Sequence, residues 1–86
     1  MISKDVTVNI PNGLGGRPIA LLVQVASRYD SSVYVQCENK KVNAKSIMGM
    51  MTLGLDNGES VTVVTEGVDE AEAMQGLKEY LTQNHS

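Results

Sequence analysis

Apolar side chains occupy every second position in three short stretches of this chain, a pattern that a strand with one buried face produces. These stretches are residues 6–10, 33–37 and 42–44. The polar residues 38–40 join the last two, which we therefore expect to form a hairpin. A fourth strand is predicted over residues 60–66, which are rich in Val and Thr. Four strands in so short a chain leave room for little besides a sheet and the segments that connect it.

Three connecting segments have the composition of helices. Pro18 suits a first helical turn, and the apolar residues after it fall on one face, namely Ile19, Leu22, Val23 and Ala26. Ser46 can cap a short helix over Ile47–Leu53, because a serine oxygen there accepts a hydrogen bond from an unpaired backbone N–H. Asp69 begins a last helix with acidic residues in its first turn, although Gly76 costs that helix roughly 1 kcal/mol relative to alanine.

The order of elements is therefore strand, helix, strand, strand, short helix, strand, helix. Too few residues lie between the strands for crossovers other than these helices, so we expect an antiparallel sheet with helices on one face, an α+β fold. We expect residues 1–86 to form a single domain. The chain has no Trp or Phe and five Met, so Val, Ile, Leu and Met should fill its core.

Composition excludes several classes of function. A formal net charge of −3 argues against direct nucleic-acid binding, which needs clustered Lys and Arg. Cys37 is the only cysteine, so no internal disulfide or multi-cysteine metal site is expected, and a reducing cytoplasm fits best. Residues 1–8 alternate polar and apolar side chains and form neither a signal peptide nor a membrane span. We expect no cofactor, no metal and no catalytic residue.

Two segments carry a resemblance to a known family. They are Asn-Gly-Leu-Gly-Gly-Arg-Pro at residues 12–18 and Asn-Ala-Lys-Ser-Ile-Met-Gly-Met-Met at residues 43–51. Both resemble the signatures of the phosphocarrier protein HPr family, as do residues 52–54 and 66–70. The resemblance implies an open-faced β-sandwich, in which a four-stranded antiparallel sheet is covered on one face by three helices.

The first signature departs from the family at one position. HPr proteins normally have a histidine before the small residue, arginine and proline, and it relays phosphate from Enzyme I to sugar-transport components. This chain has Gly15 there, and glycine has no ring nitrogen on which a phosphoramidate can form. The only histidine, His85, is next to the last residue, and we interpret it as a solvated tail residue. The chain thus resembles a histidine-less HPr-like variant.

The second signature is intact, and its serine is Ser46. The resemblance implies that an ATP-dependent HPr kinase/phosphorylase phosphorylates Ser46. It also implies that the product is a corepressor for a catabolite control protein of the lactose-repressor type, which itself makes the DNA contact. The implied contact surface contains Arg17, Ala20, Gln24, Ser46, Ile47, Met48, Met51 and Thr52.

Each of these residues has a simpler interpretation. Ser46 taken alone is a plain helix cap, and Arg17 is a solvated residue of a first helical turn. The apolar residues Ile47, Met48 and Met51 could belong to the core, but a short helix cannot bury every side, so we expect at least Met48 to be partly exposed.

The alternation places Cys37 on the inner face of its strand, which favours a buried, inert thiol over a redox sensor.

Three functions are therefore compared. The first is a phosphoserine-switched module of carbon catabolite control. The second is a constitutive binding module on an HPr scaffold, which acts without phosphorylation. The third is a remnant phosphotransfer component with another nucleophile, which Enzyme I and phosphoenolpyruvate would label. The first strand could also exchange between two copies, so a homodimer is possible.

Overall fold

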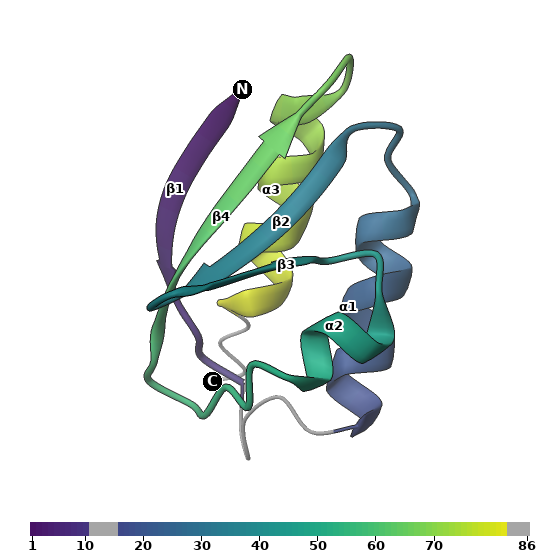
Figure 1. The fold of residues 1–86 in the computed structure, drawn as a ribbon. Coiled ribbons are helices and arrows are strands. Elements are labelled where there is room, and N and C mark those ends of the chain that lie inside the picture. Colours follow the sequence, from purple (N-terminus) through teal and green to yellow (C-terminus); the bar gives the residue numbers. More distant parts are fainter. Residues whose placement is uncertain (11–15, 83–86) are drawn as a thin grey trace.

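The computed structural model describes residues 1–10 and 16–82 of the chain (Figure 1). No helix in these two ranges is long and apolar enough to cross a membrane. The observed order of elements is the predicted one and confirms the α+β class. The elements are β1 (Ile2–Thr7), α1 (Gly16–Ser27), β2 (Ser32–Cys37), β3 (Lys40–Asn43), α2 (Ile47–Met51), β4 (Ser60–Glu66) and α3 (Glu70–Leu81).

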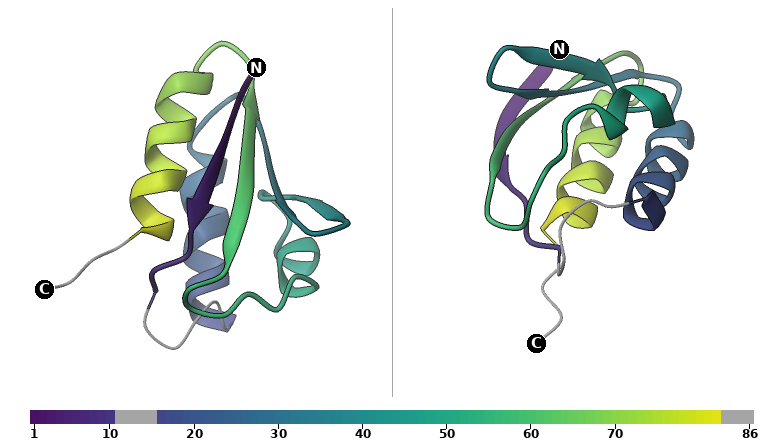
Figure 2. Two further views of the ribbon diagram at one scale, coloured as in Figure 1. Left: turned by 90° about the vertical axis from the view of Figure 1, so that its left-hand side faces the viewer. Right: turned by 60° about the horizontal axis from the view of Figure 1, so that its bottom comes forward.

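The four strands form one antiparallel sheet in the order β1-β4-β2-β3, so β1 and β3 are its edges. The helices α1 and α3 lie side by side against one face of this sheet (Figure 2). The short α2 packs against α1 and β3, at the edge opposite β1. The predicted antiparallel sheet with three helices is thereby confirmed.

Alternation along the strands separates a core face from a solvent face. On the solvent face, Asp5 of β1, Thr62 of β4 and Gln36 of β2 stand in one row across the sheet. The Thr62 hydroxyl donates a hydrogen bond to Asp5 at 2.8 Å. Buried aliphatic side chains fill the other side, as the composition predicts. They are Val6, Val8, Ile10, Ile19, Leu22, Ala26, Val33, Val35, Ala44, Met50, Leu55, Val61, Val63, Ala73, Met74, Leu77 and Leu81.

The hairpin between β2 and β3 has a tighter turn than predicted. Lys40 pairs with Cys37 and belongs to β3, so the turn consists of Glu38 and Asn39 alone. Glu38 has a φ of 56°, in the left-handed region that short hairpin turns require. The alternating pattern identified the strands, but the exact turn depended on a backbone conformation that glutamate seldom adopts.

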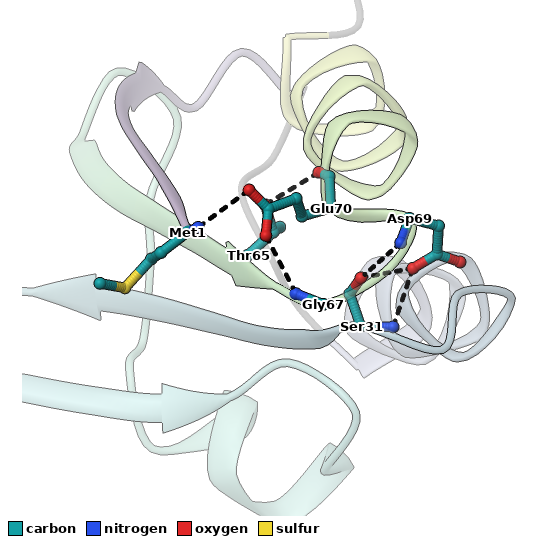
Figure 3. Close-up of polar contacts among 6 residues, drawn as sticks. All are labelled: Met1, Ser31, Thr65, Gly67, Asp69 and Glu70. Carbon is teal, nitrogen blue, oxygen red and sulfur yellow. Dashed lines mark hydrogen bonds and ion pairs between the residues drawn. The ribbon is translucent and has the colours of Figure 1, made fainter.

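Asp69 immediately precedes α3, but its side chain does not cap that helix. Its carboxylate instead accepts hydrogen bonds from the connection between α1 and β2 (Figure 3). The donors are the backbone N–H of Asp30 at 3.0 Å, the backbone N–H of Ser31 at 2.9 Å and the Ser31 hydroxyl. The Ser31 Oγ in turn accepts from the Asp69 N–H at 3.2 Å. Asp69 thus stands at the start of α3 as predicted, but these donors, and not the first turn of the helix, take up its carboxylate.

Two glycines allow α3 and the connection before it to approach α1 and its C-terminal loop. Gly67 has a φ of 150°, and a Cβ there would lie 2.7 Å from the Ser31 Cα. Gly76, inside α3, lies under the ring of Tyr29, and a Cβ there would be 3.0 Å from the Tyr29 Cζ. The glycine in α3 therefore has a packing role that outweighs its low helix propensity.

The Asp69 network should make folding stability depend on pH. Hydrogen bonds from the Ser31 hydroxyl and then from the Asp30 N–H lower the pKa of Asp69. A carboxyl whose pKa is lowered by folding stabilises the protein above its unfolded pKa, about 4, and this stabilisation is lost as pH falls through the folded pKa. Urea unfolding should therefore show that Asp69→Asn is less stable than wild type at pH 7. This difference should shrink below about pH 4, and a difference that is constant with pH would contradict the assignment.

Replacing Gly76 by alanine should not stabilise α3, despite alanine's intrinsic advantage of about 1 kcal/mol. The new methyl group would force the Tyr29 ring to move. In a Tyr29→Ala background the same replacement should raise the free energy of unfolding by up to about 1 kcal/mol. Thermal or urea unfolding of the four proteins in this double-mutant cycle measures the coupling, and equal effects of Gly76→Ala in both backgrounds would rule out the packing role.

Candidate functional site

Ser46 caps the N-terminus of α2, as the sequence predicts. Its backbone is extended, with φ −110° and ψ 115°, and its Oγ accepts a hydrogen bond from the Gly49 N–H at 3.1 Å. The Ser46 N–H donates to the Asn43 carbonyl at 3.0 Å, which fixes the turn before the helix. The side chain remains only half-buried. The hydroxyl is therefore held at a defined position near the surface.

The other end of α2 is also fixed, one turn from Ser46. The helix ends at Met51 rather than at the predicted Leu53, and Thr52 follows as its C-cap. The Thr52 hydroxyl donates to the Gly49 carbonyl at 2.7 Å. The ammonium group of Lys40, from β3, donates to the Thr52 carbonyl at 3.1 Å. The Gly49 carbonyl also accepts from the Thr52 N–H at 3.2 Å, and Lys40 gives the Thr52 carbonyl a partner from outside the helix.

The α2 side chains divide into one anchor and three exposed groups. Met50 is 1% exposed and lies in the core. Ile47 is 46% exposed, Met51 58% and Met48 80%. The expected exposure of Met48 is confirmed, and a core position for these three side chains is excluded. Three large apolar groups exposed together on one short helix make this helix a candidate contact surface.

Helix α1 adds a stripe of side chains beside α2, against which it packs. Arg17 and Gln24 are exposed and Ala20 is half-buried. Leu21, which the sequence interpretation missed, is 42% exposed. It lies four residues after Arg17 and three before Gln24, so helical spacing could have placed it on this stripe. We call the following set the α1–α2 surface: Arg17, Ala20, Leu21, Gln24, Ser46, Ile47, Met48, Met51 and Thr52.

The α1–α2 surface carries one basic and no acidic side chain. Arg17 is exposed and makes no ion pair with any residue in the described ranges. Lys45, beside Ser46 in the sequence, is already engaged, because its ammonium group donates to the Tyr29 carbonyl at 2.7 Å, just beyond the end of α1. The guanidinium of Arg17 is thus available to an anionic group.

Two residues that entered the functional argument lie outside the described ranges. Gly15, at the degenerate phosphocarrier position, falls in residues 11–15, and His85 falls in residues 83–86. Whatever its conformation, glycine at position 15 has no nucleophilic side chain. Within residues 1–10 and 16–82, no group of three His, Cys, Asp or Glu side chains is arranged to hold a metal ion.

Cys37 is partly exposed, which corrects the prediction of a buried thiol. It lies at the end of β2 and lines an open pocket of about 420 Å³ with Glu38, Lys40, Leu53 and Glu59 among its other lining residues. Desolvation, and then the charges of Glu59 and Glu38, raise the pKa of its thiol. The protonated thiol is a poor nucleophile, so the expected low reactivity agrees with its surroundings.

Comparison with known proteins gives one consistent result. The family model described as PTS HPr component phosphorylation site matches residues 2–83. The chain is 49% identical over 77 residues to an HPr-like protein Crh of Halalkalibacterium halodurans, with 90% of this chain and 92% of the relative covered.

Solved structures agree with the sequence comparison. The phosphocarrier protein HPr of Bacillus anthracis superposes with a TM-score of 0.90 at 44% identity, covering 93% of this chain and 95% of the other. The catabolite repression protein Crh of Bacillus subtilis, whose structure is described as a domain-swapped dimer, gives 0.79 at 43% identity, covering 100% and 99%.

Proposed function

The chain belongs to the HPr family, and from this premise we propose that it is a regulatory protein of carbon catabolite control rather than a phosphate carrier. Both the relative from Halalkalibacterium and the one from Bacillus subtilis are named Crh, and the latter is described as a catabolite repression protein. The observation that carries the proposal is Ser46 itself, held at the edge of an exposed apolar surface while the histidine position contains glycine.

Loss of the histidine removes the phosphocarrier chemistry. Gly15 has no side chain that could attack a phosphoryl group, so transfer from Enzyme I cannot pass through this position. His85 is separated from Gly15 by most of the chain and belongs to neither family signature. The protein then acts as a cytoplasmic binding protein without catalytic residues, cofactor or metal.

The proposed modification is phosphorylation of Ser46 by an ATP-dependent HPr kinase/phosphorylase. The Ser46 Oγ attacks the γ-phosphorus of ATP, an O–P ester bond forms, the bond to the bridging oxygen breaks, ADP leaves and the hydroxyl proton is released. The ester adds about −1.5 to −2 charge at neutral pH. That charge would stand directly beside the exposed Ile47 and Met48. An apolar surface with one anionic edge offers a specific contact to a partner with basic residues.

The proposed partner is a catabolite control protein of the lactose-repressor type, for which the phosphorylated chain acts as corepressor. The α1–α2 surface supports this proposal by combining exposed apolar groups with the exposed guanidinium of Arg17. The residues proposed for the contact are Arg17, Ala20, Gln24, Ser46, Ile47, Met48, Met51 and Thr52. DNA is contacted by the partner, in keeping with the net charge of −3 of this chain.

The second candidate is a constitutive module that binds a partner through the same surface without phosphorylation. It is favoured by the fact that the apolar part of the α1–α2 surface is already exposed in the unmodified protein. Replacing Ser46 by alanine separates the two candidates. Binding that requires the phosphate disappears in this variant, whereas constitutive binding remains.

Incubation with ATP and an HPr kinase from a related bacterium should add a single phosphate to the protein, read as intact mass. Ser46→Ala should gain none, and Ser60→Ala, which removes an exposed hydroxyl from β4, should gain it as wild type does. Circular dichroism should show that all three proteins are folded. An unmodified wild type would refute the serine switch, and labelling by Enzyme I with phosphoenolpyruvate would refute the loss of carrier function.

We also propose that the protein forms a homodimer by exchange of β1. This strand begins the described chain, lies at an edge of the sheet and pairs with β4, so an equivalent strand from a second copy could take its place. The dimer reported for the Bacillus subtilis relative supports the proposal.

Light scattering at increasing protein concentration should detect a species of twice the monomer mass. Monomer and dimer should interconvert slowly, because β1 must detach from β4 before it can be exchanged. A monomer at all concentrations would contradict it.

A further inference from the structure

The five methionines of the chain fall into two groups by exposure. Met50 and Met74 are 1% and 3% exposed and lie in the core. Met48 and Met51 are 80% and 58% exposed, and both project from α2 beside Ser46. Met1, at 76%, is exposed at the start of β1, far along the chain from this helix. A five-residue helix therefore presents two accessible thioethers on the surface proposed to bind a partner.

Oxidation changes a methionine from an apolar to a polar group without breaking the chain. A sulfur lone pair attacks one oxygen of a peroxide, the S–O bond forms, the O–O bond breaks, and water leaves once the remaining oxygen is protonated. Sulfur loses two electrons and the peroxide gains them. The sulfoxide is polar, and methionine sulfoxide reductases return it to the thioether. Susceptibility follows exposure, which separates Met48 and Met51 from the buried pair.

We propose that Met48 and Met51 form a reversible oxidation site for peroxides, and that oxidation there removes the apolar character of the α1–α2 surface. The effect on partner binding rests on the proposed function, whereas the site itself does not. With both thioethers oxidised, the large apolar groups remaining on this surface are Ile47 and Leu21, each less than half exposed. Burying a sulfoxide against a partner without a hydrogen-bond donor is unfavourable, so binding should weaken.

The structure allows this change without unfolding. Met50 anchors α2 in the core and is protected, while Ser46 and Thr52 fix the two ends by hydrogen bonds that involve no sulfur. The exposed thioethers can therefore become polar while the helix keeps its position. Oxidation and phosphorylation of Ser46 would thus change the same surface in different ways. Oxidation removes apolar contact area, whereas the phosphate adds negative charge.

The thiol of Cys37 is less suited to a peroxide reaction than the exposed thioethers. Thiols react with peroxides as thiolates, and burial together with Glu59 and Glu38 raises the pKa of Cys37. Its Sγ lies 3.9 Å from a carboxylate oxygen of Glu59, which accepts its weak hydrogen bond. A Cys37→Ser variant makes a suitable background, because it removes thiol oxidation and leaves α2 unchanged.

The test treats folded Cys37→Ser protein with hydrogen peroxide and follows each methionine by peptide mass mapping. Met48 and Met51 should be oxidised at least about tenfold faster than Met50 and Met74. The matched control adds Met48→Leu and Met51→Leu, which keep apolar side chains of similar volume and cannot be oxidised. It retains Met1, so any effect of oxidation at the N-terminus appears in both proteins.

Two measurements then decide the inference. On a hydrophobic-interaction column, treated protein should elute earlier than untreated protein, and methionine sulfoxide reductase should reverse this shift. The leucine control should shift less, by the effect of Met1 oxidation alone. After phosphorylation of Ser46, peroxide should weaken binding to the catabolite control protein by about tenfold or more in the methionine form only. The inference is overturned if Met48 and Met51 are oxidised no faster than Met50 and Met74. It is also overturned if oxidation leaves the elution or the binding of the methionine form unchanged. Absence of binding by untreated protein would refute the proposed function, while rates and elution still decide the oxidation site.

Discussion

A helix of five residues makes too few internal hydrogen bonds to be stable alone, so α2 depends on contacts at its ends and on one buried side chain. Ser46 accepts from the Gly49 N–H, Lys40 reaches the Thr52 carbonyl, and Met50 lies in the core. With a single anchor, the remaining apolar side chains of the helix are left on the surface. The proposed contact surface thus follows from the way a very short helix is held, and the residue proposed to be modified is one of its supports.

Much of the fold was predictable because its signals are local. Alternating aliphatic residues define the strands, and the short connections leave an antiparallel sheet as the outcome. Contacts between distant segments gave no such signal. The Asp69 carboxylate accepts hydrogen bonds from residues 38 and 39 positions earlier, and Gly76 lies under the ring of Tyr29. These two contacts depend on which loops meet in the folded protein. Capping patterns and helix propensities describe only neighbouring residues in the sequence, so they could not predict either contact.

The candidate site was predictable to a similar extent, and for a different reason. The cap at Ser46 and the exposure of Met48 were expected and agree with the structure. The contact roles of Ser46, Met48 and Met51 came from the family resemblance and stay predictions. Leu21 was not predicted, because an apolar residue on an amphipathic helix is ordinarily assigned to the core face, although its spacing places it beside Arg17 and Gln24. Partial exposure of Cys37 could not be foreseen, because it depends on the open pocket between the β2–β3 hairpin and the loop before β4.

The central claim is that a phosphate on Ser46 controls binding to a catabolite control protein of the lactose-repressor type. Calorimetric titration of that protein with unmodified chain, Ser46-phosphorylated chain and Ser46→Ala tests it most directly. The account predicts that the phosphorylated form binds at least about tenfold more tightly than the other two, as a charge-assisted hydrogen bond to one phosphate would require. Equal affinities of all three would contradict the account and identify a constitutive binding module.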